Sequence, residues 1–423
     1  MKRLARSRSP QLVRGPTDLG RDADQEATSS DFRARRTGLR ALSGVRTSPM
    51  ASQFLQRVLE PPAYGWERDG VFYKPTTREI MSHWASRMNV FATRKNWLPF
   101  TNWVWTLGLA PFLVLFVTKY FSWGHLLVGF LYAMVALGTV NIVWLHRYCT
   151  HQAFTFSHPF YRFIIRNLTI RLVPEEIYVV SHHVHHAYTE EAGDPYNAFG
   201  GRLYCLLAGE LHQPIARDLS PEDYARIVAM MKHTGVVANS YEQYQRWGSV
   251  CHPARLYAHF ALNWAFWYAA FYAMGGHGLA CAIFGVSALW AIGIRDFNYD
   301  AHGCGKDKRR DGDDFNRKDL SINQLFAGTV SGEWHNNHHA FPGGVRSGFM
   351  WWQLDTAYGL ILLTKLFGGI SSMRDYKSRF IEKYVKPYEA AKKAKAAGET
   401  TQLPSATEDE EEHTELPGIP DAH

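Results

Sequence analysis

Uncharged, largely apolar stretches recur along the middle of the chain. Residues 96–118 contain no charged side chain, and residues 120–146 contain no Asp, Glu, Lys or Arg. About 20 apolar residues are enough for one helix to cross a bilayer, so each stretch predicts one transmembrane helix. A third uncharged stretch, residues 256–294, is interrupted by GGHG at 275–278. Its length suits two helices joined by a glycine turn, so the pattern predicts four transmembrane helices in two hairpins.

Basic residues near the ends of these stretches predict the orientation of the helices. They gather at one end of every predicted helix, whereas the outer turns offer only Lys119. Positive charge favours the cytoplasmic side, so we expect both tails and the long segments 147–254 and 296–423 to be cytoplasmic. The expected fold is an all-α, multi-pass integral membrane protein with a cytosolic helical cap. The basic residues on that side are Arg94, Lys95, Arg147, Arg255 and Arg295.

Polar segments around the hairpins set the expected domain boundaries. Residues 1–50 are rich in Arg, Ser, Gly and Pro without apolar periodicity, which favours a disordered extension or a true start at Met50. The stretch 349–370 is apolar but carries Asp355 and Lys365, which favours an amphipathic surface helix, with a fifth span as the alternative. The expected segments are the extension (1–50), a cytosolic pre-membrane segment (51–95), hairpin one (96–146), a cytosolic cap (147–254), hairpin two (255–295), a second cytosolic region (296–376) and a charged disordered tail (377–423).

Charge and cysteine usage narrow the expected partners. The net charge of +7 and the pI near 9.0 fit a negatively charged membrane surface or an acidic substrate group. No nucleic-acid-binding motif is found in the sequence, so nucleic acid is not expected as a partner. The five cysteines are scattered and odd in number, which argues against a disulfide framework and for thiols in a reducing compartment.

Histidine is concentrated in four short blocks. Two blocks follow the first predicted hairpin, and two follow the second, so all four emerge on the same face of the membrane. The second block, SHHVHHAY, and the fourth, EWHNNHHAF, share the spacing H-x-x-H-H. The blocks supply His146 and His151; His182, His185 and His186; Asn298 and His302; and His335, His338 and His339.

These spacings suit metal ligation. On a helix, positions i, i+3 and i+4 fall within an arc of about 100°, so one H-x-x-H-H block can aim three imidazoles at one point. His146 and His151 diverge on a regular helix, so we expect the helix to end or distort between them. Nine imidazoles exceed one tetrahedral zinc site but suffice for two metals of higher coordination, and imidazole suits iron. We interpret His183 as a neighbour of the ligands.

At these residues the chain resembles the membrane fatty acyl desaturases, specifically the Δ9 branch of stearoyl-CoA-type and bacterial acyl-lipid enzymes. That branch carries H-x4-H, H-x-x-H-H, N-x3-H and H-x-x-H-H in this order on a four-span scaffold. The resemblance covers roughly residues 60–375. It implies that the nine histidines listed above bind two iron ions, and that Asn298 contacts a metal through a water molecule. Asp194 in GDPYN matches an acidic position of the family, and a hydrogen bond to a ligand imidazole is the expected role.

The resemblance also implies a function. It is the O2-dependent insertion of a cis double bond, at Δ9, into a saturated acyl chain carried on CoA or a lipid. Electrons would come from a separate ferredoxin, rubredoxin or cytochrome b5-type protein, because the sequence contains no H-P-G-G haem motif. The active site would face the cytoplasm, in the inner membrane of a bacterium or the endoplasmic reticulum or plastid membrane of a eukaryote. Tyr178 stands where animal enzymes usually carry Trp, which leaves chain length and carrier open.

Candidate substrate residues and competing functions follow from the same segments. Trp144, Tyr178 and Trp334 are candidates for lining an acyl channel, with plain core packing as the alternative. A di-iron hydroxylase or ketolase is the competing enzyme, and a metal transporter is the competing class, although its ligands should lie within the membrane spans. Candidate contacts to a headgroup or carrier, with a solvated or membrane-facing basic surface as the alternative, are Arg162, Arg166, Lys306, Lys308, Arg309 and Arg310.

Overall fold

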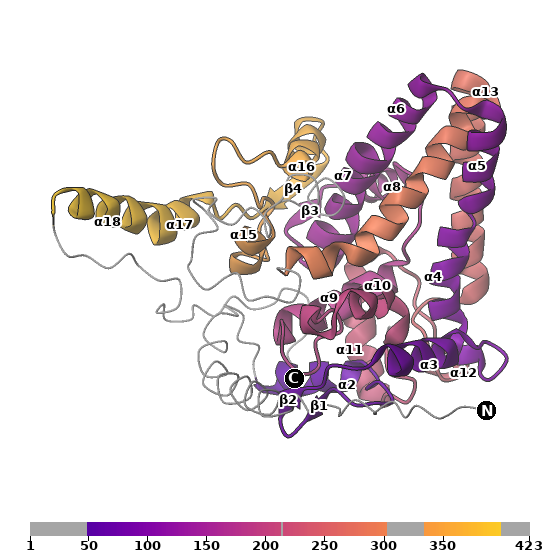
Figure 1. Ribbon diagram of the computed structural model, residues 1–423, viewed down its shortest axis with the longest axis horizontal. Helices are drawn as coiled ribbons and strands as arrows, with labels where there is room; N and C mark the ends of the chain where they lie inside the picture. The colour runs from indigo at the N-terminus through magenta and orange to yellow at the C-terminus, as the bar shows by residue number, and fades with distance from the viewer. Residues whose placement is uncertain (1–48, 213–214, 303–333, 399–423) are drawn as a thin grey trace, which may run out of the picture. The chain divides into compact units, whose positions relative to one another are not determined.

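The computed structural model describes residues 49–212, 215–302 and 334–398, which all belong to one compact unit, Ser43–His423. Most of these residues are helical (Figure 1). Three helices are long and apolar enough to cross a membrane: Arg94–Tyr120, Trp123–Thr150 and Pro253–Ala301. The structure therefore contains the long apolar helices that the sequence predicts. Whether they correspond to three or four membrane spans depends on the third helix.

The third helix, α13 (Pro253–Ala301), doubles back at the predicted glycine turn. Gly275 and Gly276 have non-helical backbone angles, and Gly276 has a positive φ of 67° that glycine adopts without strain. The rings of Trp264 and Phe284 lie 5.4 Å apart across this break. A straight helix rising about 1.5 Å per residue would separate them by about 30 Å. The two halves of α13 therefore pack against each other as a helical hairpin (Figure 1).

The first two long helices are built from consecutive segments. Arg94–Tyr120 comprises η1 (Arg94–Asn96), α4 (Trp97–Leu107), α5 (Ala110–Leu115) and η2 (Phe116–Tyr120). Trp123–Thr150 comprises α6 (Trp123–Leu131), η3 (Tyr132–Leu137), α7 (Gly138–Asn141) and η4 (Ile142–Thr150). Together with α13 these segments enclose a buried apolar core in which Phe116, Leu137 and Trp290 take part.

The remaining elements surround the ends of these helices. They are α2 (Pro49–Val58), β1 (Glu67–Arg68), β2 (Val71–Phe72), α3 (Thr77–Met88), β3 (Phe154–Phe156), α8 (Pro159–Asn167), α9 (Glu175–Tyr188), η5 (Ala198–Gly200), α10 (Arg202–Leu211), α11 (Pro221–Met231), η6 (Lys232–Thr234), α12 (Tyr241–Trp247), α15 (His335–Ala340), α16 (Thr356–Leu366), β4 (Ile370–Met373), α17 (Lys377–Phe380), η8 (Ile381–Val385) and α18 (Lys386–Ala396). The strands form two antiparallel pairs, β1 with β2 and β3 with β4.

The pair β3–β4 joins segments that are distant in sequence. Phe154 lies opposite Met373 in the ladder, so the chain after the first histidine block is held against the chain that follows α16. Helix α16 has 11 residues and is therefore about 16 Å long, roughly half the ~30 Å hydrocarbon core. The alternative of a fifth span at 349–370 is thus wrong. The surface orientation of this helix stays a prediction.

The end of the second long helix is distorted where the spacing of His146 and His151 requires it. Segment η4 is π-helical, and the N–H of His151 donates to the carbonyl of His146, five residues earlier, at 3.1 Å. The helix ends at His151. The extra residue in the turn rotates the two side chains toward a common side, and the predicted distortion is confirmed.

Candidate metal centre

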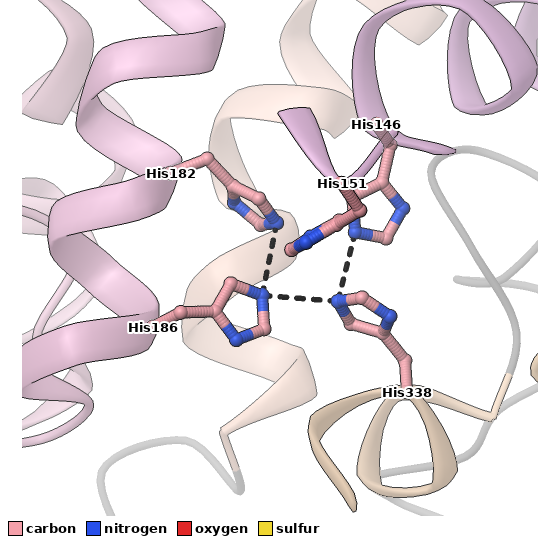
Figure 2. A group of neighbouring side chains, drawn as sticks. All are labelled: His146, His151, His182, His186 and His338. Carbon is pink, nitrogen blue, oxygen red and sulfur yellow. Dashed lines mark hydrogen bonds between the residues drawn. The ribbon is translucent and has the colours of Figure 1, made fainter. Parts of the chain in front are cut away.

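Four elements bring the nine histidines together. The end of η4 supplies His146 and His151, α9 supplies three histidines, the last turn of α13 leads to His302, and α15 supplies three more. They form two groups, and within each group the candidate ligand atoms lie within 4.8 Å of one another. The first group, shown in Figure 2, is His146, His151, His182, His186 and His338; the second is His185, His302, His335 and His339.

Each H-x-x-H-H block divides between the two groups, which differs from the expectation that a block aims at one point. His182 and His186 belong to the first group, whereas His185 belongs to the second. On a helix, positions i and i+4 differ by about 40°, but i+3 and i+4 differ by about 100°. The middle histidine of a block, at i+3, therefore points to a different place from the histidines at i and i+4. In the fourth block the same rule sends His338 to the first group and its neighbours to the second.

The ring nitrogens converge within each group. In the first, Nε2 of His338 lies 2.9 Å from Nε2 of His146 and 3.0 Å from Nε2 of His186, which in turn lies 3.2 Å from Nε2 of His182 (Figure 2). In the second, Nε2 of His335 lies 3.0 Å from Nε2 of both His302 and His339. Such convergence directs several nitrogen lone pairs into one small volume, as a metal site requires.

Burial favours the neutral form of several of these imidazoles. All nine are buried except His339, which is half-buried. Burial lowers the pKa of His151, His182, His186 and His338 well below the ordinary value, and the neighbouring imidazoles lower it further. Neutral imidazole is the form that binds metals. The donor set thus fits two metal ions held by nitrogen ligands, a chemistry that suits iron.

Two carboxylates contact the Nδ1 atoms of two histidines in the second group. Oδ1 of Asp194 lies 2.9 Å from Nδ1 of His185, and Oε1 of Glu190 lies 3.1 Å from Nδ1 of His302. Asp194 also accepts hydrogen bonds from the backbone N–H groups of Glu190 and Tyr196, so its position is fixed. Such contacts set the tautomer and orientation of an imidazole whose other nitrogen faces the metal. Sequence reasoning missed Glu190, although its place directly after the second block was the available signal.

Replacing Asp194 with asparagine tests this arrangement. We expect the affinity for one of two metals to fall about 10- to 100-fold, because the variant keeps the side-chain shape but loses the charge that orients His185. The measurement is anaerobic equilibrium dialysis of the purified protein against Fe(II), with metal analysis. The control is Asp223→Asn, which removes a carboxylate paired with Arg57. Equal iron binding by the two variants would contradict a role for Asp194 at the metal.

A buried ion pair links the first block to the chain after the fourth. Nη2 of Arg147 donates to both carboxylate oxygens of Asp355, at 2.8 and 2.9 Å. Asp355 also accepts from the backbone N–H groups of Ser347, Gly348 and Tyr358. Burial opposes ionisation of Asp355, but the guanidinium and these N–H groups outweigh it and hold the pKa of the carboxyl below its ordinary value.

A cavity with an empty volume of about 1130 Å³, part of which is open to solvent, lies beside both groups. Four of the histidines line it, together with Tyr178 and Asn298. Trp144 and Trp334 are not among the described residues that line it; their indole N–H groups donate to Glu175 and to the carbonyl of Leu354. Apolar walls come mainly from Ile142, Leu145, Leu172, Ile177, Trp290 and Ile294.

The candidate headgroup residues lie elsewhere. Arg162 donates to the carbonyl of His233 at 3.1 Å, and Arg166 donates to Glu175 at 2.8 Å. Neither lines the cavity beside the histidines. The remaining candidates, Lys306, Lys308, Arg309 and Arg310, lie outside the described residues.

The structure combines three helices long and apolar enough to cross a membrane with two histidine groups that could each hold a metal ion. Comparison with known families agrees, because the model of the fatty acid desaturase family matches residues 121–363. The chain belongs to this family, and it is an oxidoreductase of the desaturase class.

Curated relatives are desaturases of several specificities. The chain is 29% identical to the acyl-CoA C20 Delta5-desaturase of Anemone leveillei over 279 residues, 62% of this chain and 78% of that protein. It is 24% identical to the sn-1 stearoyl-lipid 9-desaturase of Anabaena variabilis over 281 residues, 64% of this chain and 93% of that protein. A shorter match, 36% over 102 residues, is to the chloroplastic palmitoyl-monogalactosyldiacylglycerol delta-7 desaturase of Arabidopsis thaliana, covering 23% of this chain and 26% of that protein.

Proposed function

We propose that the protein inserts a cis double bond, at the Δ9 position, into a saturated acyl chain carried on CoA or on a lipid, in a reaction that consumes O2. The observation that carries this proposal is the convergence of nine histidines from four blocks into two groups, with members of both groups lining one cavity. The relatives act at Δ5, Δ7 and Δ9, so the Δ9 assignment rests on the order and spacing of the histidine blocks.

The nine histidines would hold two iron ions, one in each group, and Asn298 would contact the second metal through a water molecule. Bound iron supplies the oxidising power, with O2 and external electrons, that an unactivated C–H bond requires. The protein's own residues would orient the imidazole ligands and exclude bulk water. Asp194 and Glu190 fix the imidazoles of His185 and His302, and burial of the groups keeps bulk water from the site. A ferredoxin, rubredoxin or cytochrome b5-type protein would deliver the electrons.

The cavity would determine which carbons react. An acyl chain lying along apolar residues such as Leu145, Leu172 and Trp290 would be presented to the histidine groups in one position. Holding two adjacent methylene groups close to the metals converts a random encounter into an oriented reaction. One hydrogen would leave each of the two carbons, and the bend of the chain in the cavity would select the cis product.

The proposed topology has four spans with the catalytic regions, 147–254 and 296–376, on the cytoplasmic face. Two findings support it. The halves of α13 form a hairpin, so each half can cross the bilayer once. The histidine blocks lie at the end of Trp123–Thr150 and at the end of α13, and they meet in space, so both helices end on the same side.

Expression in a desaturase-deficient host tests the function. We expect new cis-monounsaturated fatty acids in the total lipid, with the double bond located at Δ9 by mass spectrometry. The matched control is His335→Ala, because Nε2 of this residue lies 3.0 Å from two other ligand nitrogens. Hydroxy or keto acids in place of alkenes would favour the hydroxylase or ketolase alternative. Identical fatty acid profiles for the wild type and the variant would refute catalysis at this site.

A further inference from the structure

A second, separate cavity has three arginines among otherwise largely apolar lining residues. Its empty volume is about 510 Å³, part of which is open to solvent. It lies between α8, the segment 171–175, the loop at 235–237 and the first turns of α13. Three guanidinium groups, those of Arg166, Arg171 and Arg255, face one carboxylate, that of Glu175.

The charges of this cavity are not balanced. Arg166 and Arg171 both donate to Oε1 of Glu175. Burial would favour the neutral acid, but these two guanidinium groups outweigh it and lower the pKa of Glu175 to about 2. Among the described residues, Arg255 donates one side-chain hydrogen bond, to Asn239 at 3.1 Å, and has no carboxylate partner. The lining therefore keeps an excess of positive charge that an anion would neutralise.

The cavity lies at the start of an apolar helix. Arg255 and His259 line it from one face of α13, and Leu262 and Phe266 continue that face at positions i+7 and i+11. These two side chains are 70% and 64% exposed. On the neighbouring face, Trp264 and Trp267 donate indole hydrogen bonds to the backbone carbonyls of Arg171 and Asn167. Tryptophan with a hydrogen-bonded N–H is typical of the membrane–water interface.

A cationic cavity that continues into an exposed apolar stripe matches the chemistry of an anionic lipid. The phosphate would lie among Arg255, Arg171 and Arg166, and an acyl chain would run along Leu262 and Phe266. The stripe from Arg255 to Phe266 is about 16 Å long at 1.5 Å per residue, which suits a large part of an acyl chain. A free phosphate ion would use the cationic end only. The stripe therefore favours the lipid.

We propose that this cavity binds the headgroup of an anionic phospholipid, at a site distinct from the histidine groups and the cavity beside them. The segment 171–173 separates the two, because Arg171 lines the cationic cavity whereas Leu172 and Val173 line the other. Guanidinium groups bind phosphate through charge-assisted, often bidentate hydrogen bonds.

Lipid binding by the full-length, iron-loaded protein in an uncharged detergent tests the proposal. Native mass spectrometry would follow a titration with dioleoylphosphatidylglycerol, with dioleoylglycerol as the lipid that lacks a headgroup. We expect Arg255→Gln to weaken binding of the phospholipid about tenfold, since a hydrogen bond to a charged group contributes roughly one such factor. Arg255→Lys should restore most of the binding. The matched control is Arg246→Gln, which removes an exposed arginine on α12.

Each outcome decides the proposal. A loss confined to Arg255→Gln and to the lipid with a headgroup supports it. Equal binding by Arg255→Gln and Arg246→Gln overturns it, and so does inorganic phosphate binding to the wild type as tightly as the phospholipid. Iron content and double-bond formation are measured on the same preparations. If iron content and double-bond formation are normal but Arg255→Gln binds the phospholipid as tightly as the wild type does, this inference fails and the proposed function stands.

Discussion

Replacing His186 with alanine is expected to abolish desaturation and to lower the bound iron. Nε2 of His186 lies 3.2 Å from Nε2 of His182 and 3.0 Å from Nε2 of His338, at the centre of the first group. Losing a metal ligand removes several kcal/mol of stabilisation from the reacting state, so the rate should fall on the order of 100-fold or more. The measurements are double-bond formation in the deficient host and iron per chain in the purified protein.

The same helix provides the control. His183 is buried at 1% exposure on α9, three residues before His186, but it belongs to neither histidine group. His183→Gln should retain iron and keep activity within a few-fold of the wild type, because His183 belongs to neither histidine group and its replacement should affect mainly packing. Equal losses of iron and activity in the two variants would show that His183 is wrongly excluded from the metal-binding groups.

The local spacing of the histidines was visible in the sequence, but their grouping was not. The blocks and the distortion between His146 and His151 follow from helix geometry, which acts over a few residues. Which metal each histidine faces depends on how η4, α9, α13 and α15 are placed around one another. His185 and His186 are adjacent in sequence yet belong to different groups. Helix geometry separates His185 from His186 on α9, but the placement of the other helices determines which group each of them joins.

The fold, too, was predictable from the sequence where it depends on neighbouring residues and not where it depends on distant ones. The glycine turn at Gly275 and Gly276 was predictable because glycine marks a break in an apolar run. The contact of Glu190 with His302 joins residues 112 positions apart, and nothing in the surrounding sequence of either residue indicates the other. Trp144, a candidate for lining the acyl channel, is not among the residues that line the described cavity. Its indole N–H donates to the buried carboxylate of Glu175.

The pair of Arg147 and Asp355 is a buried long-range contact that the sequence did not reveal. The two residues are 208 positions apart, and their side chains are 3% and 4% exposed. Arg147 directly follows His146, and two of the backbone N–H groups that donate to Asp355, those of Ser347 and Gly348, belong to the loop that follows α15. Arg147 also donates to the carbonyl of Val345 in that loop. The pair therefore fixes the first histidine block relative to the fourth.

Asp355→Asn is expected to destabilise the protein by about 3–5 kcal/mol, because it leaves a buried guanidinium without its charge partner. The midpoint of thermal unfolding of the purified protein measures the effect. The control is Glu382→Gln, which breaks the exposed ion pair with Lys386 and should cost less than about 1 kcal/mol. Because the folded pKa of Asp355 lies below its ordinary 3.8, its contribution is present above pH 3.8 and is lost as the pH falls below that value. The difference between the wild type and the variant should therefore narrow under acid conditions.

Replacing both partners separates the stability of the pair from its role in positioning. Arg147→Met combined with Asp355→Leu removes both charges, so no buried charge is left unpaired and much of the stability should return. Iron binding should not return to the same extent, since an apolar pair cannot accept the N–H groups of Ser347 and Gly348 that hold the loop after α15. The prediction is a double variant that unfolds near the wild-type temperature but binds less iron at the group containing His146 and His338. Full recovery of iron would mean that packing alone places the fourth block, and a stable Asp355→Asn variant would mean that the pair does not join the two segments.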